Sequence, residues 1–276
     1  MRLALPIVLT LIAFAANSVL TRVAIAGGHA DGMSFAVLRV FAGALMLAGL
    51  ALGQRRPLRL FSRRRAIGAV TLSAYMIGFS LAYRTLDAGL GALILFGVVQ
   101  ITMFAVGALT GARPTGRALL GAAIAFAGLV VVLDPAGAGT AAFGALAMTV
   151  AGVGWGLYTL AGRGEPDALA GTAANFCLAL PICALALLPG GGQMTVTGAT
   201  LAILAGAVTS GLGYALWYAI LPRIEPATAA VLQLSVPVLA TLGGVLLLGE
   251  TVGLGFLAGA VLVLGGIALS LPRRKA

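Results

Sequence analysis

Long apolar runs separated by short polar connections make up nearly the whole sequence. A helix needs about 20 apolar residues to cross the bilayer core, with a range of about 17–25. Runs near this length occupy residues 3–26, 34–52, 66–86, 89–110, 117–133, 140–161, 170–188, 200–221, 226–248 and 252–271. The connections are mostly Gly, Pro and Arg, and none is long enough for a separate soluble domain. The pattern predicts an all-α polytopic membrane protein with ten transmembrane helices.

Composition narrows the class of protein further. The 276-residue chain is 61% hydrophobic and 9% charged, whereas soluble domains are about 45–50% apolar and about 25% charged. These values exclude a water-soluble enzyme, a disordered chain and a secreted disulfide scaffold. The net charge of +10 does not indicate nucleic-acid binding, because such binders carry a basic face on a polar body. The expected surroundings are the lipid bilayer, and nothing in the sequence demands a protein partner.

Basic residues fall mostly on one side of the predicted spans. With a cytoplasmic N-terminus, 14 of the 17 Lys and Arg residues lie in cytoplasmic connections. Arg22 and Arg84 lie on the outer side, and Arg39 lies within a span. This distribution follows the positive-inside rule and predicts that both termini are cytoplasmic. Richness in Ala, Gly and Arg, with Lys275 as the single Lys, suggests a bacterial chain and therefore the inner membrane.

The two halves of the chain resemble each other, which predicts a five-helix repeat in residues 1–135 and a second in residues 136–276. The matching segments are 109–113 with 247–251, 78–83 with 213–218, and 14–22 with 155–163. Because five is an odd number, the second copy must enter the membrane from the opposite side. Inverted repeats are typical of transporters with a midplane binding site. The alternative is that the duplication only builds a stable bundle.

Several of these segments resemble the drug/metabolite transporter superfamily, in its ten-helix EamA-type branch. The resemblance covers essentially the whole chain and rests on residues 37–41 in the second span and on paired glycines in the fifth and tenth spans. The second half adds Glu225-Pro226, Pro237 and Gly249-Glu250. Within the branch, the chain is most similar to bacterial aromatic amino-acid exporters. The resemblance implies a carrier of small metabolites, amino acids among them.

Strongly polar side chains within the predicted spans are few. The main ones are Asn17, Arg39, Gln100, Asn175 and Gln233. A charge at bilayer depth is costly, so Arg39 should face the interior or snorkel outward. It could hold the C-termini of neighbouring helices or attract a substrate carboxylate. The amides could bind a zwitterionic substrate or tie helices together.

Aromatic side chains recur at helical spacing and form a second set of candidates. Residues three or four apart share a helix face, and Trp and Tyr combine an apolar surface with a hydrogen-bonding tip. Such a surface suits large apolar substrate side chains, although packing or an interface position would also explain it. The candidates are Tyr75, Phe79, Trp155, Tyr158, Tyr214 and Trp217.

Other chemistries lack the residues they need. The sequence has one histidine, His29, in a loop, and two cysteines, Cys177 and Cys183, in one apolar run. Metal ligand sets built from several His or Cys are absent, and no cofactor or catalytic site is expected. All seven Asp and Glu residues fall at or near the ends of the predicted spans, which disfavours a pump that binds cations at a deep carboxylate.

The leading hypothesis is therefore a non-enzymatic carrier that exports small metabolites by alternating access at a central cavity. Amino acids with large apolar or aromatic side chains are the favoured cargo. A carrier of the same fold for nucleosides, sugars or polyprenyl-linked lipid is one alternative. A non-transporting membrane scaffold is another.

Overall fold

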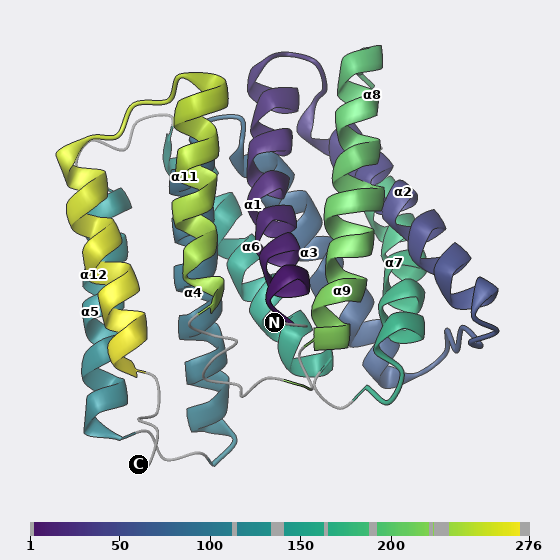
Figure 1. Cartoon of the computed structure of the whole chain (residues 1–276), viewed down its shortest axis with the longest axis horizontal. Helices are drawn as coiled ribbons and strands as arrows, with labels where there is room; N and C mark the ends of the chain where they lie inside the picture. Colours follow the sequence, from purple (N-terminus) through teal and green to yellow (C-terminus); the bar gives the residue numbers. More distant parts are fainter. Residues whose placement is uncertain are drawn as a thin grey trace.

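The computed structural model describes residues 3–111, 115–133, 141–162, 165–187, 192–220, 223 and 232–270 (Figure 1). Its longer elements are all helical. They are α1 (Ala4–Ala26), α2 (Gly32–Gly53), α3 (Arg63–Ala82), α4 (Ala88–Leu109), α5 (Gly116–Leu133), α6 (Ala141–Gly162), α7 (Ala168–Leu185), α8 (Val196–Ile203), the π-helix η1 (Leu204–Leu212), α9 (Gly213–Ile220), α11 (Ser235–Leu248) and α12 (Leu254–Ser270).

Each predicted span coincides with helical structure, and the eighth is one stretch, Val196–Ile220, made of α8, η1 and α9. Among the described residues, seven helical stretches are long and apolar enough to cross a membrane. The helices α5, α11 and α12 are shorter. The predicted ninth span, 226–248, is described only from Leu232 onward, with α11 beginning at Ser235, and Glu225 and Pro226 lie outside the described residues. The all-helical fold is confirmed, and ten membrane crossings stay a prediction.

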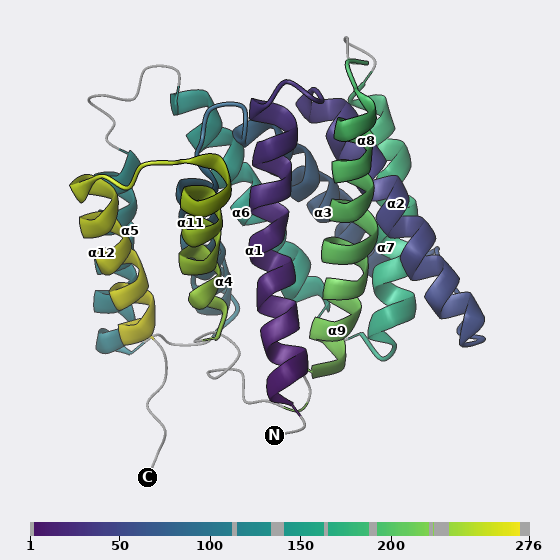
Figure 2. The same cartoon turned by 45° about the horizontal axis from the view of Figure 1, so that its top comes forward.

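The helices stand side by side in one bundle, with α5 and α12 paired at one end (Figure 2). The repeated glycines explain how closely this pair approaches. A Cβ on Gly121 would lie 2.5 Å from the Gly266 carbonyl oxygen, and one on Gly128 would lie 2.9 Å from the Gly259 carbonyl oxygen. Small residues allow such backbone contact between membrane helices. The glycines that mark the repeat in the sequence thus form the seam between its fifth and tenth helices.

Contacts between helices pair up when the two predicted repeats are exchanged. The contact of α3 with α6 corresponds to that of α1 with η1 and α9, and both are present. The contact of α4 with α6 corresponds to that of α1 with α11, and again both are present. The contacts of α2 with α7, α4 with α11 and α5 with α12 correspond to themselves. The repeat boundaries stay a prediction, with which these contacts are consistent.

Local sequence sets where α2 begins and also connects it to the second half. The Asp31 carboxylate accepts from the backbone N–H groups of Met33 and Ser34, at 3.0 and 2.9 Å, which caps the helix N-terminus. Its other oxygen accepts from the backbone N–H groups of Gly192 and Gln193, at 3.1 and 3.0 Å. One carboxylate thus starts a helix and fixes a loop that is 161 residues away.

Candidate functional site

A fully buried arginine lies at the centre of the bundle. Arg39 of α2 has no solvent exposure, so it does not snorkel outward. Its Nε donates to the Ser210 hydroxyl at 3.1 Å. Its Nη2 donates to Asn17 Oδ1 and to the Tyr75 hydroxyl, both at 3.1 Å. The guanidinium also lies 4.8 Å from the centroid of the Phe79 ring. Elements α1, α2, α3 and η1 therefore meet at one charged group.

The π-helix supplies two of the hydroxyls in this cluster. Asn17 Oδ1 accepts from Thr209 Oγ1 at 2.6 Å and from Ser210 Oγ at 3.2 Å, in addition to the bond from Arg39. Both hydroxyls lie in η1, and a Cβ on Gly206 of η1 would collide with the Arg39 carbonyl oxygen. π-helical turns are frequently found at functional sites. Here the wider turn and the small residue place Thr209 and Ser210 against α1 and α2.

An aromatic cavity adjoins the arginine cluster. It is lined by Phe14, Asn17, Ser18, Tyr75, Phe79, Leu95, Phe96, Trp155 and Tyr214. The Trp155 ring is central, with centroids 4.9 Å from those of Tyr75 and Tyr214 and 6.4 Å from that of Phe14. In this conformation the cavity has room for roughly one or two water molecules. The helices must therefore separate before a larger molecule enters.

A second pocket lies nearer the predicted cytoplasmic end. Its walls include Tyr158, Asn175 and Tyr218, together with Arg65 and Glu165. Arg65 Nη1 and Glu165 Oε2 form an ion pair of 2.7 Å in which both side chains are about one-tenth exposed. This pair connects α3 to the segment before α7, and so joins the two halves of the chain at that end.

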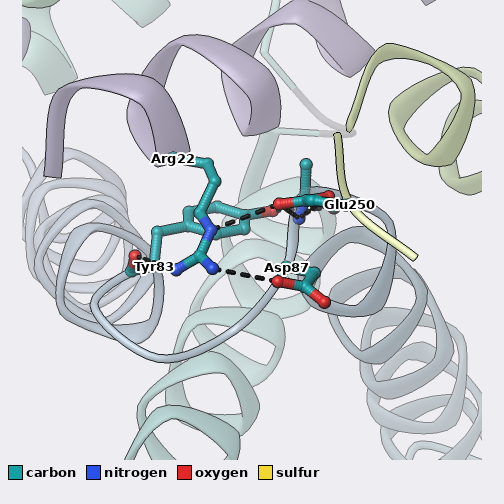
Figure 3. Close-up of polar contacts among 5 residues, drawn as sticks. Arg22, Tyr83, Asp87 and Glu250 are labelled. Atoms are coloured by element: carbon teal, nitrogen blue, oxygen red, sulfur yellow. Dashed lines mark hydrogen bonds and ion pairs between the residues drawn. The ribbon is translucent and has the colours of Figure 1, made fainter. Parts of the chain in front are cut away.

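A cluster of charged residues joins the two halves at the predicted outer end (Figure 3). Arg22 of α1 contacts Asp87 Oδ1 at 2.9 Å and Glu250 Oε1 at 3.2 Å, and it donates to the Tyr83 carbonyl oxygen. Both Glu250 oxygens accept from the Ala88 backbone N–H, at 3.0 and 2.9 Å. Glu250 therefore places a negative charge at the N-terminus of α4, where the helix dipole favours it. We call this set the Arg22–Asp87–Glu250 cluster.

Burial dominates the electrostatics of Glu250. Loss of hydration raises the pKa of its carboxyl above the ordinary 4.5, although the bond from the Ala88 N–H lowers it, and proximity to Asp87 raises it further. Asp31 behaves in the opposite way. Its burial alone would raise the pKa, but hydrogen bonds from Ser34, Gly192 and Gln193 together lower it below 3.8.

The structure divides the residues proposed from the sequence into groups. Those brought together at the arginine cluster and aromatic cavity are Asn17, Arg39, Tyr75, Phe79, Trp155 and Tyr214. Trp217 packs on Phe14 with ring centroids 5.8 Å apart. Tyr158 and Asn175 lie in the second pocket, and Tyr158 also stacks on Trp155. Gln100 and Gln233 line neither of these two pockets.

Sequence reasoning did not select some residues that lie here. Phe14 is the repeat counterpart of Trp155, and both line the cavity. The repeat alignment therefore carried a signal that would have found Phe14. Thr209 and Ser210 are not among the candidates from the sequence, because nothing in the sequence indicates that they face Asn17. Within the described residues, no three His, Cys, Asp or Glu side chains gather as metal ligands.

Comparisons with known proteins identify the family of this chain. Residues 142–271 match the EamA-like transporter family. An uncharacterized protein of Pseudomonas aeruginosa is 49% identical over 269 residues, which cover 97% of this chain and 93% of that protein. The chain belongs to the EamA-like transporter family. Members of this family are membrane transporters rather than enzymes.

Two further comparisons extend the likeness beyond the matched segment. An uncharacterized transporter of Archaeoglobus fulgidus is 26% identical over 243 residues, covering 84% of this chain and 86% of that protein. A protein of known crystal structure shares the fold with a TM-score of 0.67 and 22% identity, over 95% of this chain and 96% of that one. The fold that this chain shares with the solved structure therefore extends over nearly its whole length, including the first half.

Proposed function

We propose that this EamA-family protein exports small metabolites across the bacterial inner membrane by alternating access, with both termini in the cytoplasm. The favoured cargo is an amino acid with a large apolar or aromatic side chain. The observation that carries the proposal is the aromatic cavity beside buried Arg39, at the junction of helices from both halves. Aromatic walls suit an apolar side chain, and the guanidinium suits a carboxylate.

The symmetry of the cavity supports alternating access. Phe14 and Trp155 are counterparts in the two predicted repeats, as are Phe79 and Tyr214, and all four line the same cavity. A site built from equivalent residues of two inverted units can be exposed to either side when the units exchange conformations. A bundle that is merely duplicated for stability has no need of such a shared cavity.

Contacts at both ends of the bundle support an occluded conformation. The Arg22–Asp87–Glu250 cluster joins the two halves at one end, and the Arg65–Glu165 ion pair joins them at the other. Breaking one set while keeping the other would open the cavity to one side only. This is the minimum that alternating access requires.

Uptake into proteoliposomes tests the proposal. We expect the purified protein to take up labelled phenylalanine saturably. Replacing Tyr214 or Trp155 by Ala should weaken the apparent affinity about threefold to tenfold, because each loses aromatic contacts at the cavity. Phe126→Ala is the matched control, since this α5 side chain is 60% exposed and lies outside the cavity lining.

Two results would contradict parts of the proposal separately. Uptake no faster than in empty liposomes, across a broad panel of amino acids, would contradict the proposed substrate class. Full transport by both cavity variants would contradict the proposed binding site. Competition by unlabelled nucleosides, sugars or polyprenyl phosphates against a transported tracer identifies a carrier of another cargo.

A further inference from the structure

The charge of Arg39 has no carboxylate partner among the described residues. The five acidic residues that the structure describes all lie at helix ends or in loops, where they cap helices or pair with other arginines. The groups that Arg39 contacts are the hydroxyls of Ser210 and Tyr75, the amide of Asn17 and two aromatic rings. A buried charge without a counter-ion is costly, and a bound anion would neutralise it.

One nitrogen of this guanidinium is left over. Arg39 Nη1 is buried and has no hydrogen-bond partner, whereas Nε and Nη2 are both engaged. An unpaired charged donor in the interior carries the full cost of lost hydration. The nitrogen belongs to a group that lies against Asn17, Tyr75 and Phe79, three residues that line the aromatic cavity. Arg39 itself does not line the cavity in this conformation, so an acceptor from a ligand reaches this donor only when the helices separate.

Among the described residues, the same cavity offers no counter-ion to an ammonium group. Asn17 Oδ1 already accepts three hydrogen bonds. The Tyr75 hydroxyl accepts from Arg39 and from Tyr214, which uses both of its lone pairs and leaves its hydrogen to donate. The lining residues Ser18 and Tyr214 keep hydroxyl oxygens that can accept, but none of the described carboxylates lines the cavity. An ammonium would gain cation–π contacts from the rings, but it would have no counter-ion and would be repelled by the guanidinium.

We propose that the cavity recognises its cargo as a monoanion, an aromatic or apolar carboxylic acid whose carboxylate binds Arg39 Nη1, and that a substrate ammonium is not required. This inference rests on the proposed function, since it defines the cargo of the same cavity. Loading by a monoanion leaves the site with no net charge, whereas loading by a zwitterion leaves one positive charge, that of the ammonium, without a partner. The deaminated acid therefore binds more tightly than the amino acid of the same skeleton.

Four probes that share a phenyl ring separate these possibilities. They are 3-phenylpropanoate with only the carboxylate, L-phenylalanine with both charges, phenethylamine with only the ammonium, and neutral 3-phenylpropanamide. Binding to the wild-type protein in nanodiscs is measured by quenching of Trp155 and Trp217 fluorescence. We expect 3-phenylpropanoate to bind about tenfold or more tightly than L-phenylalanine, and the amine and amide to bind weakest.

Variants and transport complete the test. Arg39→Gln should remove the preference for the anion, and Arg39→Lys should keep it in part, because the charge remains without the planar fork. The wild-type ranking of the four probes requires no variant, so a poorly folded Arg39 variant does not affect the test. In proteoliposomes, 3-phenylpropanoate should compete with labelled phenylalanine and should itself carry one negative charge per molecule as a measurable current.

The outcomes distinguish this inference from the proposed function. Transport of phenylalanine with no competition from 3-phenylpropanoate would overturn the inference and leave the proposed function standing. Equal or tighter binding of L-phenylalanine or phenethylamine would also overturn it. Absence of binding and transport for all four probes would contradict the inference and the proposed aromatic cargo together.

Discussion

A single buried guanidinium organises the centre of this protein. Arg39 bonds to residues 22, 36 and 171 positions away in the sequence, so its neighbours come from three other elements. Hydrogen bonds to hydroxyl and amide groups spread its charge, and the Phe79 face adds a cation–π contact. These contacts explain how a charge is tolerated at this depth in the bundle.

Gly206 determines how close the π-helix comes to α2. A Cβ at this position would collide with the Arg39 carbonyl oxygen, and it would lie 2.9 Å from the Ala42 Cβ. We expect Gly206→Ala to push η1 away from α2 and to lower the free energy of unfolding by about 1–3 kcal/mol, as overpacking does. Thermal unfolding in detergent measures the change.

A matched control for this substitution lies on α2 itself. A Cβ on Gly49 would meet no atom within 4 Å, so Gly49→Ala should leave the melting temperature unchanged or raise it slightly through better helix propensity. If Gly206→Ala melted at the wild-type temperature and transported normally, the close approach of η1 to α2 would be without consequence.

At the scale of elements, short-range capping sets where the helices begin, and contacts between segments distant in the sequence set where the helices lie. The eighth span shows both effects. Thr195 caps α8 through the Gly198 N–H, and its own N–H donates to the His29 carbonyl oxygen at 2.8 Å. The loop before α8 is therefore attached to the turn between α1 and α2. The π-helical middle of the same span then brings Thr209 and Ser210 to Asn17.

Asp31 provides a test of this attachment. Asp31→Ala removes the α2 cap and the bonds from Gly192 and Gln193, and should destabilise the protein by about 1–2 kcal/mol or more. Asp31→Asn is the matched variant. Its side-chain oxygen can still cap α2, but its NH₂ group cannot accept from the loop, so its loss should be smaller. Melting temperatures measure both losses of stability. Equal melting temperatures for the wild type and the two variants would contradict this role of Asp31.

The pH dependence of this contribution has a definite sign. Because the folded-state pKa of Asp31 is lowered, its contribution is fully present above the ordinary carboxyl pKa of 3.8. This contribution is lost as the pH falls from 3.8 through the lowered pKa that Asp31 has in the folded protein. Asp31→Ala lacks this carboxylate, so its free energy of unfolding should fall less than that of the wild-type protein when the pH is lowered through this range.

At the scale of the whole molecule, the two halves are joined by charged contacts at both ends and enclose a cavity between them. The outer contact is the Arg22–Asp87–Glu250 cluster, in which one arginine holds two carboxylates. Arg22→Gln leaves these carboxylates facing each other. We expect the outer end to open more often, by about tenfold, because a charged hydrogen-bonded contact is lost.

Cysteine labelling measures this opening. Ser18→Cys, in a background without Cys177 and Cys183, places a thiol at the cavity wall, and its reaction with an impermeant maleimide from outside reports access. Arg84→Gln is the matched control, since Arg84 is an exposed arginine near the same end. Equal labelling rates in Arg22→Gln and Arg84→Gln would show that the cluster does not close the cavity.

The raised pKa of Glu250 adds a pH dependence to the same measurement. The closed form binds a proton more readily than an open form in which Glu250 is hydrated, so opening releases a proton. Labelling by a maleimide also becomes faster with pH because the thiolate is the reacting form, so the rate is compared with that of Glu250→Gln, which cannot titrate at this position. The ratio of the two labelling rates should rise as the external pH increases above 4.5 through the raised pKa of Glu250, and then level off.

The sequence by itself determined the class of protein and the positions of its helices. Hydropathy is a local property, and a bilayer accepts only chains whose backbone groups are paired within helices or closed barrels. The family, the repeated glycines and the candidate side chains Arg39, Tyr75 and Trp155 could therefore be identified from residue patterns. Which of the candidates act together could not, because the bonds of Arg39 span up to 171 residues.

Only the tertiary structure decided the partners of each polar group. Asn17 joined Arg39 and the π-helix hydroxyls, whereas Asn175 joined a different pocket. The π-helical turn in η1 shifts the faces of the eighth span relative to a regular α-helix, so a 3.6-residue period misplaces Thr209 and Ser210. Charge pairing at the ends depends on loops folding onto distant helices. Those contacts follow from how the two halves pack, and no local pattern encodes them.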